Sequence, residues 1–157
     1  MPVAIALGSN LGDRERVLRG AAAALDALVS GLRVSRWHTT APVDVAPQPD
    51  FLNGAATGTT TLPARALLDR LLDIERQLGR QRPHPGAART LDLDLILYGD
   101  AVIDESGLVV PHPRFRERRF VLEPLAEIAA DWVDPVTGLT VAALRARLGP
   151  PGESPRT

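Results

Sequence analysis

The sequence contains no Cys and no Lys, and all 18 of its basic residues are Arg. The absence of Cys excludes disulfides, thiol nucleophiles and zinc sites built from thiolates. The absence of Lys excludes Schiff-base chemistry and the lysine of a P-loop. Any chemistry in this chain therefore depends on Arg, Asp, Glu, three His residues, hydroxyl groups and the backbone.

The chain also lacks an excess of charge of one sign, since 18 basic and 19 acidic residues give a net charge of -1 at pH 7. This balance argues against binding along a nucleic-acid backbone, which requires many cationic contacts. No apolar run approaches the roughly 20 residues of a membrane-spanning helix, and the chain does not begin with the basic and apolar regions of a signal peptide. We therefore expect a cytoplasmic protein whose partners include neither a membrane nor nucleic acid.

The composition is that of an ordinary globular domain, with 157 residues, 45% of them hydrophobic and 24% charged. A chain of this length can bury a substantial core as one domain. We predict a single domain over 1–148. The Pro- and Gly-containing segment 149–157 is predicted to be a frayed tail.

Hydrophobic periodicity predicts that helices and strands alternate along the chain. Strands are expected over 3–7, 51–61 and 90–98, with extended segments over 32–39, 102–103 and 109–114. Helices are expected from 13 to about 31, from 63 to 79, around 121–128 and over 141–148, with Pro124 marking a break or a fresh start in the third of them. Irregular segments are expected over 40–50 and 80–88 because of their Pro and Gly content. This order favours an α+β fold in which helices pack on a mainly antiparallel sheet.

The clearest strand carries two carboxylates. Over 90–98, Leu residues at every second position predict one apolar face, and the opposite face holds Asp92 and Asp94 together with Ile96 and Tyr98. Residues two apart on a strand share a face with Cα atoms about 6 to 7 Å apart. Two carboxylates at this spacing are suited to share Mg²⁺ ions completed by substrate phosphates. A solvated polar face is the alternative interpretation.

Arg residues flank this strand in two windows of the sequence. The members are Arg76, Arg80, Arg82 and Arg89 before the strand, and Arg114, Arg116, Arg118 and Arg119 after it. Guanidinium groups bind phosphate oxygens in bidentate geometry and keep their charge when desolvated. The pattern favours a polyphosphate site, although ordinary surface pairing with Glu75, Glu117 and Glu123 would explain part of it.

Aromatic residues are few, with three Phe, two Trp and one Tyr. Phe51 lies two residues before Asn53, and a ring beside an amide suits a flat heterocycle. Packing in the core is the alternative for Phe51. His112, between two Pro residues, is either a turn residue or a group that reaches phosphate.

Several short motifs, in this order and spacing, together resemble the 6-hydroxymethyl-7,8-dihydropterin pyrophosphokinase family of folate biosynthesis. They are ALGSNLG at 6–12, TAP at 40–42, PDFLN at 49–53, IE at 74–75 with GR at 79–80, RTLDLDL at 89–95, VPH at 110–112 and FVLEPL at 120–125. The resemblance covers about 3–128, and the RTLDLDL element is its most specific part.

This resemblance implies a ferredoxin-like α+β sandwich and the Mg²⁺-dependent transfer of diphosphate from ATP to the hydroxymethyl group of a reduced pterin, with release of AMP. It implies that Asp92 and Asp94 hold two Mg²⁺ ions. The implied catalytic residues are Arg80, Arg82, Arg89, Asp92 and Asp94. The implied nucleotide contacts are Glu75, Arg80, Arg82, Arg89, His112 and Arg118. The implied pterin contacts are Asn10, Thr40, Val43, Phe51, Asn53 and Phe120, with the two Phe rings on either side of the pterin.

The sequence also departs from the family pattern. It reads PGAA at 85–88, where many members have Arg-Trp-Gly-Pro, and it has Pro113 and Leu72 where an aromatic residue and a Gln are often found. Two other functions stay open at this point: a binding module in which 114–119 contacts nucleic-acid phosphates, and an Asp-x-Asp metal enzyme acting on another diphosphate. A monomer is expected.

Overall fold

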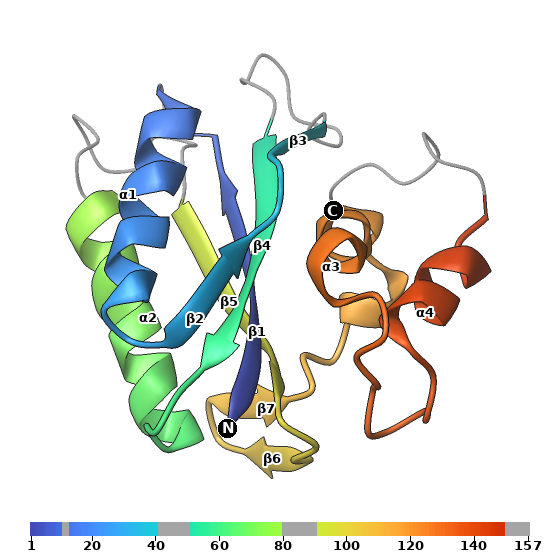
Figure 1. Ribbon diagram of the computed structural model, residues 1–157. Helices are drawn as coiled ribbons and strands as arrows, with labels where there is room; N and C mark the ends of the chain where they lie inside the picture. Colours follow the sequence, from blue (N-terminus) through green and yellow to red (C-terminus); the bar gives the residue numbers. More distant parts are fainter. Residues whose placement is uncertain (11–12, 41–50, 80–90, 150–157) are drawn as a thin grey trace.

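The computed structural model describes residues 1–10, 13–40, 51–79 and 91–149. Its centre is a five-stranded antiparallel sheet in the order β2-β4-β1-β5, and β3 pairs with the same edge of β4 as β2 but further along that strand (Figure 1). The strands are β1 (Pro2–Ser9), β2 (Ser30–Val34), β3 (His38–Thr40), β4 (Phe51–Thr59) and β5 (Leu91–Tyr98). A separate hairpin pairs β6 (Ile103–Glu105) with β7 (Leu108–Val110).

Helices cover both faces of this sheet, as Figure 1 shows. Helices α1 (Arg14–Asp26) and α2 (Ala64–Gly79) lie on one face. Helix α3 (Arg119–Ala129), preceded by the short 3-10 helix η1 (Phe115–Glu117), lies on the other, and α4 (Val141–Arg147) packs against α3. The predicted α+β sandwich with a mainly antiparallel sheet is confirmed.

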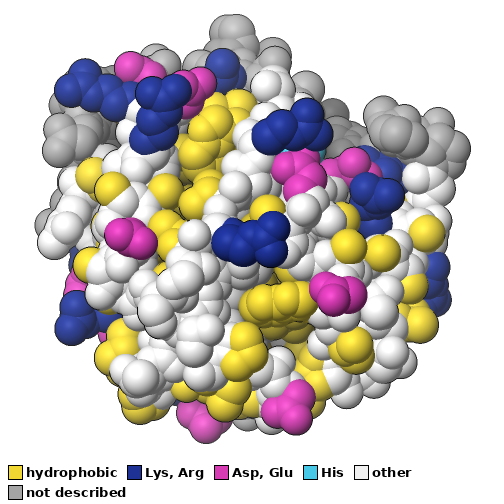
Figure 2. All heavy atoms as spheres, in the orientation of Figure 1, with side chains coloured by type: hydrophobic (Ala, Val, Ile, Leu, Met, Phe, Trp, Pro, Cys, Tyr) yellow, Lys and Arg dark blue, Asp and Glu magenta, His cyan; other side chains and the backbone are white. Residues whose placement is uncertain are grey.

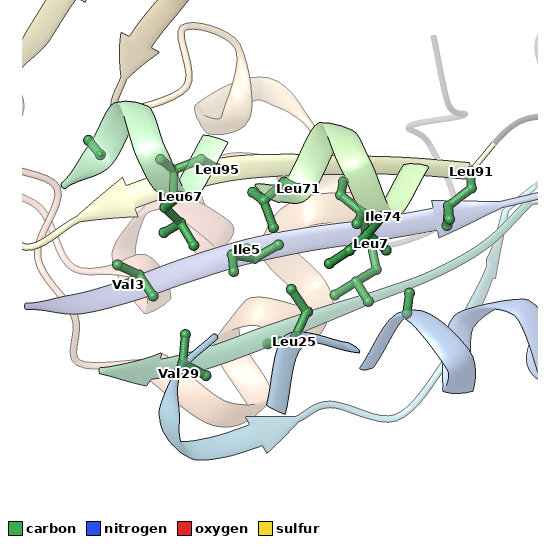
Figure 3. Packing of buried hydrophobic residues seen from close by; sticks show 14 of the residues in the cluster. Val3, Ile5, Leu7, Leu25, Val29, Leu67, Leu71, Ile74, Leu91 and Leu95 are labelled. Atoms are coloured by element: carbon green, nitrogen blue, oxygen red, sulfur yellow. The ribbon is translucent and has the colours of Figure 1, made fainter. Parts of the chain in front are cut away.

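Strand β1 shows how the sequence specifies two layers. Its large residues Val3, Ile5 and Leu7 are buried against α1 and α2 (Figure 3). The small residues Ala4 and Ala6 are buried on the opposite face, in the cluster that contains α3. Because successive side chains of a strand point to opposite faces, this alternation gives the central strand two buried sides with different amounts of space.

Helix α1 ends earlier than its apolar periodicity predicted. Asp13 caps its start by accepting a hydrogen bond from the Arg16 N–H at 3.2 Å, but the helix ends at Asp26 and not near Gly31. Gly31, with φ of 66°, belongs to β2. The prediction was wrong because the next segment pairs with β4, so the chain leaves the helix to reach the sheet edge.

The strict alternation predicted for 90–98 is correct over Leu91 to Leu95 and wrong beyond it. The β1–β5 register shifts so that Ala4 lies opposite Leu97 and Ile5 lies opposite Leu95. This irregularity adds one residue on β5, a bulge that reverses which face the following side chains occupy. Leu97 therefore packs with Ile96 on the α3 face, while Tyr98 packs on the face of α1 and α2.

Pro124 does not interrupt the third helix, contrary to the prediction, because α3 continues through it to Ala129. A proline inside a helix removes one hydrogen bond and strains the preceding turn. Here the helix is held by burial on both sides of the proline, through residues such as Leu122 and Leu125 that are fully buried in the core.

Smaller differences concern boundaries. The strand expected over 51–61 ends at Thr59, the helix expected from 63 begins at Ala64, and the extended segment 32–39 is divided between β2 and β3. Apart from Gly149, the expected tail 149–157 lies outside the described residues, and so do the two expected irregular segments apart from Thr40. The single-domain boundary at 148 therefore stays a prediction.

The surface is mixed in charge. On the face shown in Figure 2, Arg and acidic side chains are interspersed. Among the described residues, no helix has the length and apolar character needed to cross a membrane.

Candidate functional site

The predicted site residues come from separate parts of the chain that meet at one end of the sheet. Strands β1 and β3 end there, and the antiparallel strands β4 and β5 begin there (Figure 1). The described segments that end at Asn10 and Thr40, and those that begin at Phe51 and Leu91, therefore all border the same region. Antiparallel topology brings these distant motifs together.

The register places three site positions side by side. Gly8 of β1 lies opposite Asn53 of β4 on one side and opposite Asp92 of β5 on the other. Two residues along, Ala6 lies opposite Asp94. The prediction that the two Asp side chains share one face is confirmed, and this face is the one that α3 covers.

Small residues leave a pocket beneath this pair. Its walls are formed by the β1 residues Ala6, Leu7 and Gly8, the two carboxylates, and Phe120 of α3. A larger side chain at position 6 or 8 would occupy the space next to the carboxylates. Ala6 and Gly8 belong to the ALGSNLG motif but were not among the predicted site residues, although the alternation of small and large residues over 3–8 was a signal for them.

Glu75 joins α2 to the edge of the sheet beside the carboxylates. Its carboxylate accepts a hydrogen bond from the Leu93 N–H at 2.6 Å, a group that faces away from β1 on the outer strand. Burial raises the pKa of Glu75, and the nearby negative charges of Asp92 and Asp94 raise it further, against the hydrogen bond from Leu93 and the charge of Arg76. Three carboxylates thus lie in one acidic region, which a cation would stabilise.

His112 lies at the same outer edge. Its backbone N–H donates to the Ile96 carbonyl at 3.0 Å, and its Nδ1 accepts a hydrogen bond from the Arg114 N–H at 3.2 Å. Burial lowers the pKa of His112 and the charges of Arg118 and Arg114 lower it further, in opposition to Asp94. With Nδ1 acting as acceptor, the neutral ring carries its proton on Nε2 and can donate it to a ligand.

Arg118 and Phe120 stand at the start of α3. The guanidinium of Arg118 lies 5.5 Å from the centre of the Phe120 ring, a cation–π distance. The Nε–H of Arg118 is buried, and none of the described residues accepts a hydrogen bond from it. A buried donor without an acceptor is costly, so an anionic ligand at this point would be favoured.

The predicted pterin residues occupy the neighbouring strands. Asn53 is 1% exposed and its side-chain Nδ2 donates to the His38 carbonyl at 3.5 Å. Asn10 is also buried, directly after β1. Phe51 is partly exposed at the start of β4, where its backbone pairs with that of Thr40. Phe120 is buried on α3, and the placement of the two rings on either side of a ligand stays a prediction.

Four predicted site residues lie outside the described residues. They are Val43, Arg80, Arg82 and Arg89. Their proposed contacts stay predictions from the sequence.

The donor set fits Mg²⁺ in its chemistry. Within the described residues no group of three or more His, Cys, Asp or Glu side chains could hold a metal, and the candidate ligands are the pair Asp92 and Asp94. Mg²⁺ prefers oxygen ligands and is commonly bound by one or two carboxylates, with water and substrate phosphates completing the shell. Two carboxylates beside a small pocket match that requirement, whereas a closed protein cage would need more ligands.

Taken together, the fold and this pocket define a class: an α+β protein with an acidic pair, cationic side chains and an aromatic ring around a small-residue floor. A family model described as 7,8-dihydro-6-hydroxymethylpterin-pyrophosphokinase (HPPK) matches residues 4–130. The chain belongs to this family. Several relatives of the chain are named as pyrophosphokinases, which are transferases.

Individual relatives agree. The chain is 46% identical over 143 residues to a 2-amino-4-hydroxy-6-hydroxymethyldihydropteridine pyrophosphokinase of Synechocystis, a match that covers 89% of this chain and 72% of the relative. It is 48% identical over 126 residues to the Bacillus subtilis protein of the same name, covering 79% of this chain and 75% of that one. It also matches the Arabidopsis thaliana mitochondrial folate synthesis bifunctional protein at 42% identity, covering 84% of this chain and 24% of the longer protein.

Solved structures support the fold. A Plasmodium falciparum HPPK-DHPS triple mutant matches with a TM-score of 0.74 at 14% identity, covering 93% of this chain and 44% of that chain. An HPPK-DHPS solved in complex with substrates matches with a TM-score of 0.69 at 10% identity, covering 93% of this chain and 43% of that chain. The chain therefore spans less than half the length of these solved proteins.

Proposed function

We propose that this protein transfers diphosphate from ATP to the hydroxymethyl group of 6-hydroxymethyl-7,8-dihydropterin, with release of AMP, as a step in tetrahydrofolate biosynthesis. The observation that carries the proposal is the pocket in which Asp92 and Asp94 face Phe120 over the small residues of β1, in a chain of the pyrophosphokinase family. Carboxylates for a metal–polyphosphate complex and a ring for a flat heterocycle thus line the same pocket.

In this reaction one P–O bond forms and one P–O bond breaks. The pterin hydroxyl oxygen bonds to the β-phosphorus of ATP, and the bond from that phosphorus to the oxygen bridging the α- and β-phosphates breaks. AMP leaves with that oxygen, and the hydroxyl proton passes to solvent. Phosphoryl transfer of this kind depends mainly on positioning and charge stabilisation, so a dedicated general base is not required.

Asp92 and Asp94 would hold two Mg²⁺ ions together with phosphate oxygens. Bound Mg²⁺ supplies charge neutralisation and alignment of the phosphates. Glu75 supports this part of the site by fixing the backbone of Leu93, which lies between the two Asp residues. Its carboxylate also adds to the negative potential that attracts the cations.

Cationic and neutral donors would contact the nucleotide. Arg118 offers a buried Nε–H that no described residue accepts, and His112 in its neutral form offers Nε2–H. Arg80, Arg82 and Arg89 are proposed from their motif positions to complete the phosphate contacts. Guanidinium groups there would balance the charge that develops on the transferring group.

The pterin would lie between Phe51 and Phe120. Its ring edge would bind Asn10 and Asn53 and the backbone around Thr40 and Val43. An amide side chain both donates and accepts, which matches the alternating donors and acceptors of a pterin edge. We further propose that the enzyme acts as a monomer in the cytoplasm, without nucleic acid or membrane as a partner.

The test is the substitution Asp94→Asn, which keeps the size of the side chain and removes its charge. We expect Mg²⁺-dependent AMP release from ATP and the hydroxymethyl-dihydropterin to fall at least about 100-fold, as for loss of a group that stabilises transition-state charge. The matched control is Asp104→Asn, an exposed carboxylate of β6 outside the pocket, which should retain full activity.

Retention of most activity by the Asp94→Asn variant would refute the metal assignment. Replacing the pterin with other diphosphate acceptors tests the alternative Asp-x-Asp enzyme, since transfer to another acceptor with none to the pterin would favour it. A salt-dependent affinity for RNA, with no response to nucleotide, would favour the binding module.

A further inference from the structure

A cluster of three polar side chains connects α3 to the strand that borders the proposed pterin site. Glu127 of α3 accepts hydrogen bonds from the Arg36 backbone N–H at 3.0 Å and from its guanidinium at 3.1 Å. The guanidinium donates to the carboxylate oxygen Oε2 of Glu127, and the same oxygen contacts His38 Nε2. The Glu127 side chain is 21% exposed and that of His38 is 26% exposed, so their contact lies at the protein surface with both side chains partly covered.

His38 connects this cluster to Asn53. The two residues are paired in register between β3 and β4, and Asn53 Nδ2 donates to the His38 carbonyl at 3.5 Å. The ring of His38 is thus held by α3, and its carbonyl orients the buried amide that is proposed to bind the pterin edge. The Glu127 carboxylate therefore links α3 to β3. Helix α3 carries Phe120, and β3 leads to Thr40.

The chain just before His38 is held on other sides as well. Ser35 Oγ accepts a hydrogen bond from the Ala55 N–H at 2.9 Å and donates to the Arg36 carbonyl at 2.7 Å. The ring of Trp37 packs so closely over Gly54 that a Cβ at Gly54 would lie 2.5 Å from it. This segment packs on β4, and β3 itself pairs with β4, so the contact of Glu127 with His38 adds a link from β3 to α3.

We propose that Glu127 is a positioning residue for the pterin: through His38 it sets the orientation of Asn53 and the distance between β3 and α3. This inference rests on the proposed function for the identity of the ligand. It predicts that loss of the Glu127 carboxylate weakens pterin binding more than nucleotide binding, because Glu127 contacts the strand β3, whereas Asp92 and Asp94, the proposed metal ligands, lie on β5.

Charge supports this role. Although burial acts in the opposite direction, the hydrogen bonds from Arg36 and His38 hold the pKa of Glu127 below its usual value. The carboxylate is therefore anionic at neutral pH and can accept several hydrogen bonds at once. A Gln at this position offers one acceptor oxygen and one donor nitrogen, so it can reproduce only part of the set.

The first experiment needs no ligand. In ¹⁵N-labelled protein, the side-chain amide signals of Asn53 report changes in the hydrogen bonding and surroundings of this group. We expect Glu127→Ala to shift or broaden these signals, and Arg36→Ala to leave them nearly unchanged because the Arg36 N–H and His38 contacts to Glu127 remain. Unchanged Asn53 signals in a folded Glu127→Ala variant would overturn the inference whatever the protein binds.

The second experiment measures binding and turnover. With Mg²⁺ and the non-cleavable analogue α,β-methylene ATP, we expect Glu127→Ala to raise the pterin Kd roughly tenfold, the scale of one charge-assisted hydrogen bond. The pterin KM should rise in parallel, with kcat and the ATP KM within about twofold of wild type, a change of less than about 0.5 kcal/mol. Glu127→Gln should recover part of the affinity. Glu105→Gln, an exposed carboxylate of β6, is the control that should change nothing.

The outcomes separate the two proposals. If the wild-type protein fails to bind the pterin, the proposed function is wrong, while the Asn53 signals still decide the coupling. If wild type binds but Glu127→Ala binds equally well, the positioning role is wrong. A parallel loss of ATP and pterin affinity with a lower Tm would show general loosening and would likewise overturn it.

Discussion

Asp134 illustrates at the residue scale how a buried charge is kept in this protein. Its carboxylate is fully buried and accepts two hydrogen bonds from Arg116, one from the Thr137 hydroxyl and one from the Val136 N–H. Burial opposes the charge, but the hydrogen bonds from Arg116, Thr137 and Val136 lower the pKa of Asp134 from 3.8 to about 2. This cluster fixes the loop that leads into α4.

We therefore predict that Asp134→Asn lowers the free energy of unfolding at pH 7 by roughly 2 kcal/mol. Because the folded-state pKa lies below the unfolded value, the stabilisation is present above pH 3.8 and is lost as the pH falls through about 2. Urea unfolding of both proteins at several pH values checks this, and the difference between them should shrink with decreasing pH. A difference that does not depend on pH would contradict the assignment.

Some of the functional residues could be predicted from patterns in the sequence, and others could not. Asp92 and Asp94 were predicted to share a face because that depends only on their spacing in one strand. Glu127 and His38 were not identified, since 89 positions separate them and no local pattern marks their contact. Their interaction exists because α3 packs back onto the β3–β4 edge.

At the scale of elements, the close contact between Trp37 and Gly54 decides how β3 joins the sheet. A Cβ at position 54 would lie 2.5 Å from Trp37 Cε3 and Cζ3, closer than carbon atoms pack. Only the absence of a side chain permits this approach, so the glycine is required by packing and not by its backbone angles.

We predict that Gly54→Ala lowers the free energy of unfolding by about 1 to 3 kcal/mol, the usual cost of overpacking. The control is Gly20→Ala in α1, where the new Cβ would be 3.7 Å from the nearest Leu78 atom. That variant should be as stable as wild type or gain up to about 1 kcal/mol from helix propensity. Chemical denaturation measures both, and equal stabilities of the two variants would show that the Trp37 contact is not constraining.

The sequence predicted that the helices and strands exist better than it predicted where they end. Helix α1 and strand β5 show why. The apolar stripe of α1 continues through Leu28, which packs on the core although the helix has ended. The Leu alternation of β5 predicts its first half correctly, but the shift between Ala4 and Ile5 depends on pairing with β1. In both cases contact with a distant strand overrides the local pattern.

At the scale of the whole molecule, the basic side chains of Lys or Arg type are all Arg. All 18 basic side chains are Arg, so the proposed phosphate contacts keep their charge at any pH at which the protein is folded. The protein also presents no side-chain amine to reagents that acylate lysine.

We predict that acylating reagents specific for amines leave ATP-dependent transfer intact, whereas an arginine-directed dicarbonyl such as phenylglyoxal abolishes it. Mg²⁺ with α,β-methylene ATP should slow the inactivation, because bound phosphates shield the arginines at the site. Mass spectrometry of the treated protein identifies the modified residues. Loss of activity on amine acylation alone, with no arginine modified, would contradict this account of the site.

The sequence by itself determined the features that depend on neighbours along the chain. These are the shared face of Asp92 and Asp94, the arginine-only cationic groups and the family motifs. The tertiary structure decided which separated segments meet: Gly8 between Asn53 and Asp92, the face of Leu97, and the link from Glu127 through His38. The physical reason is that periodicity reflects local backbone geometry, whereas register and contact follow from burying distant apolar faces against one another.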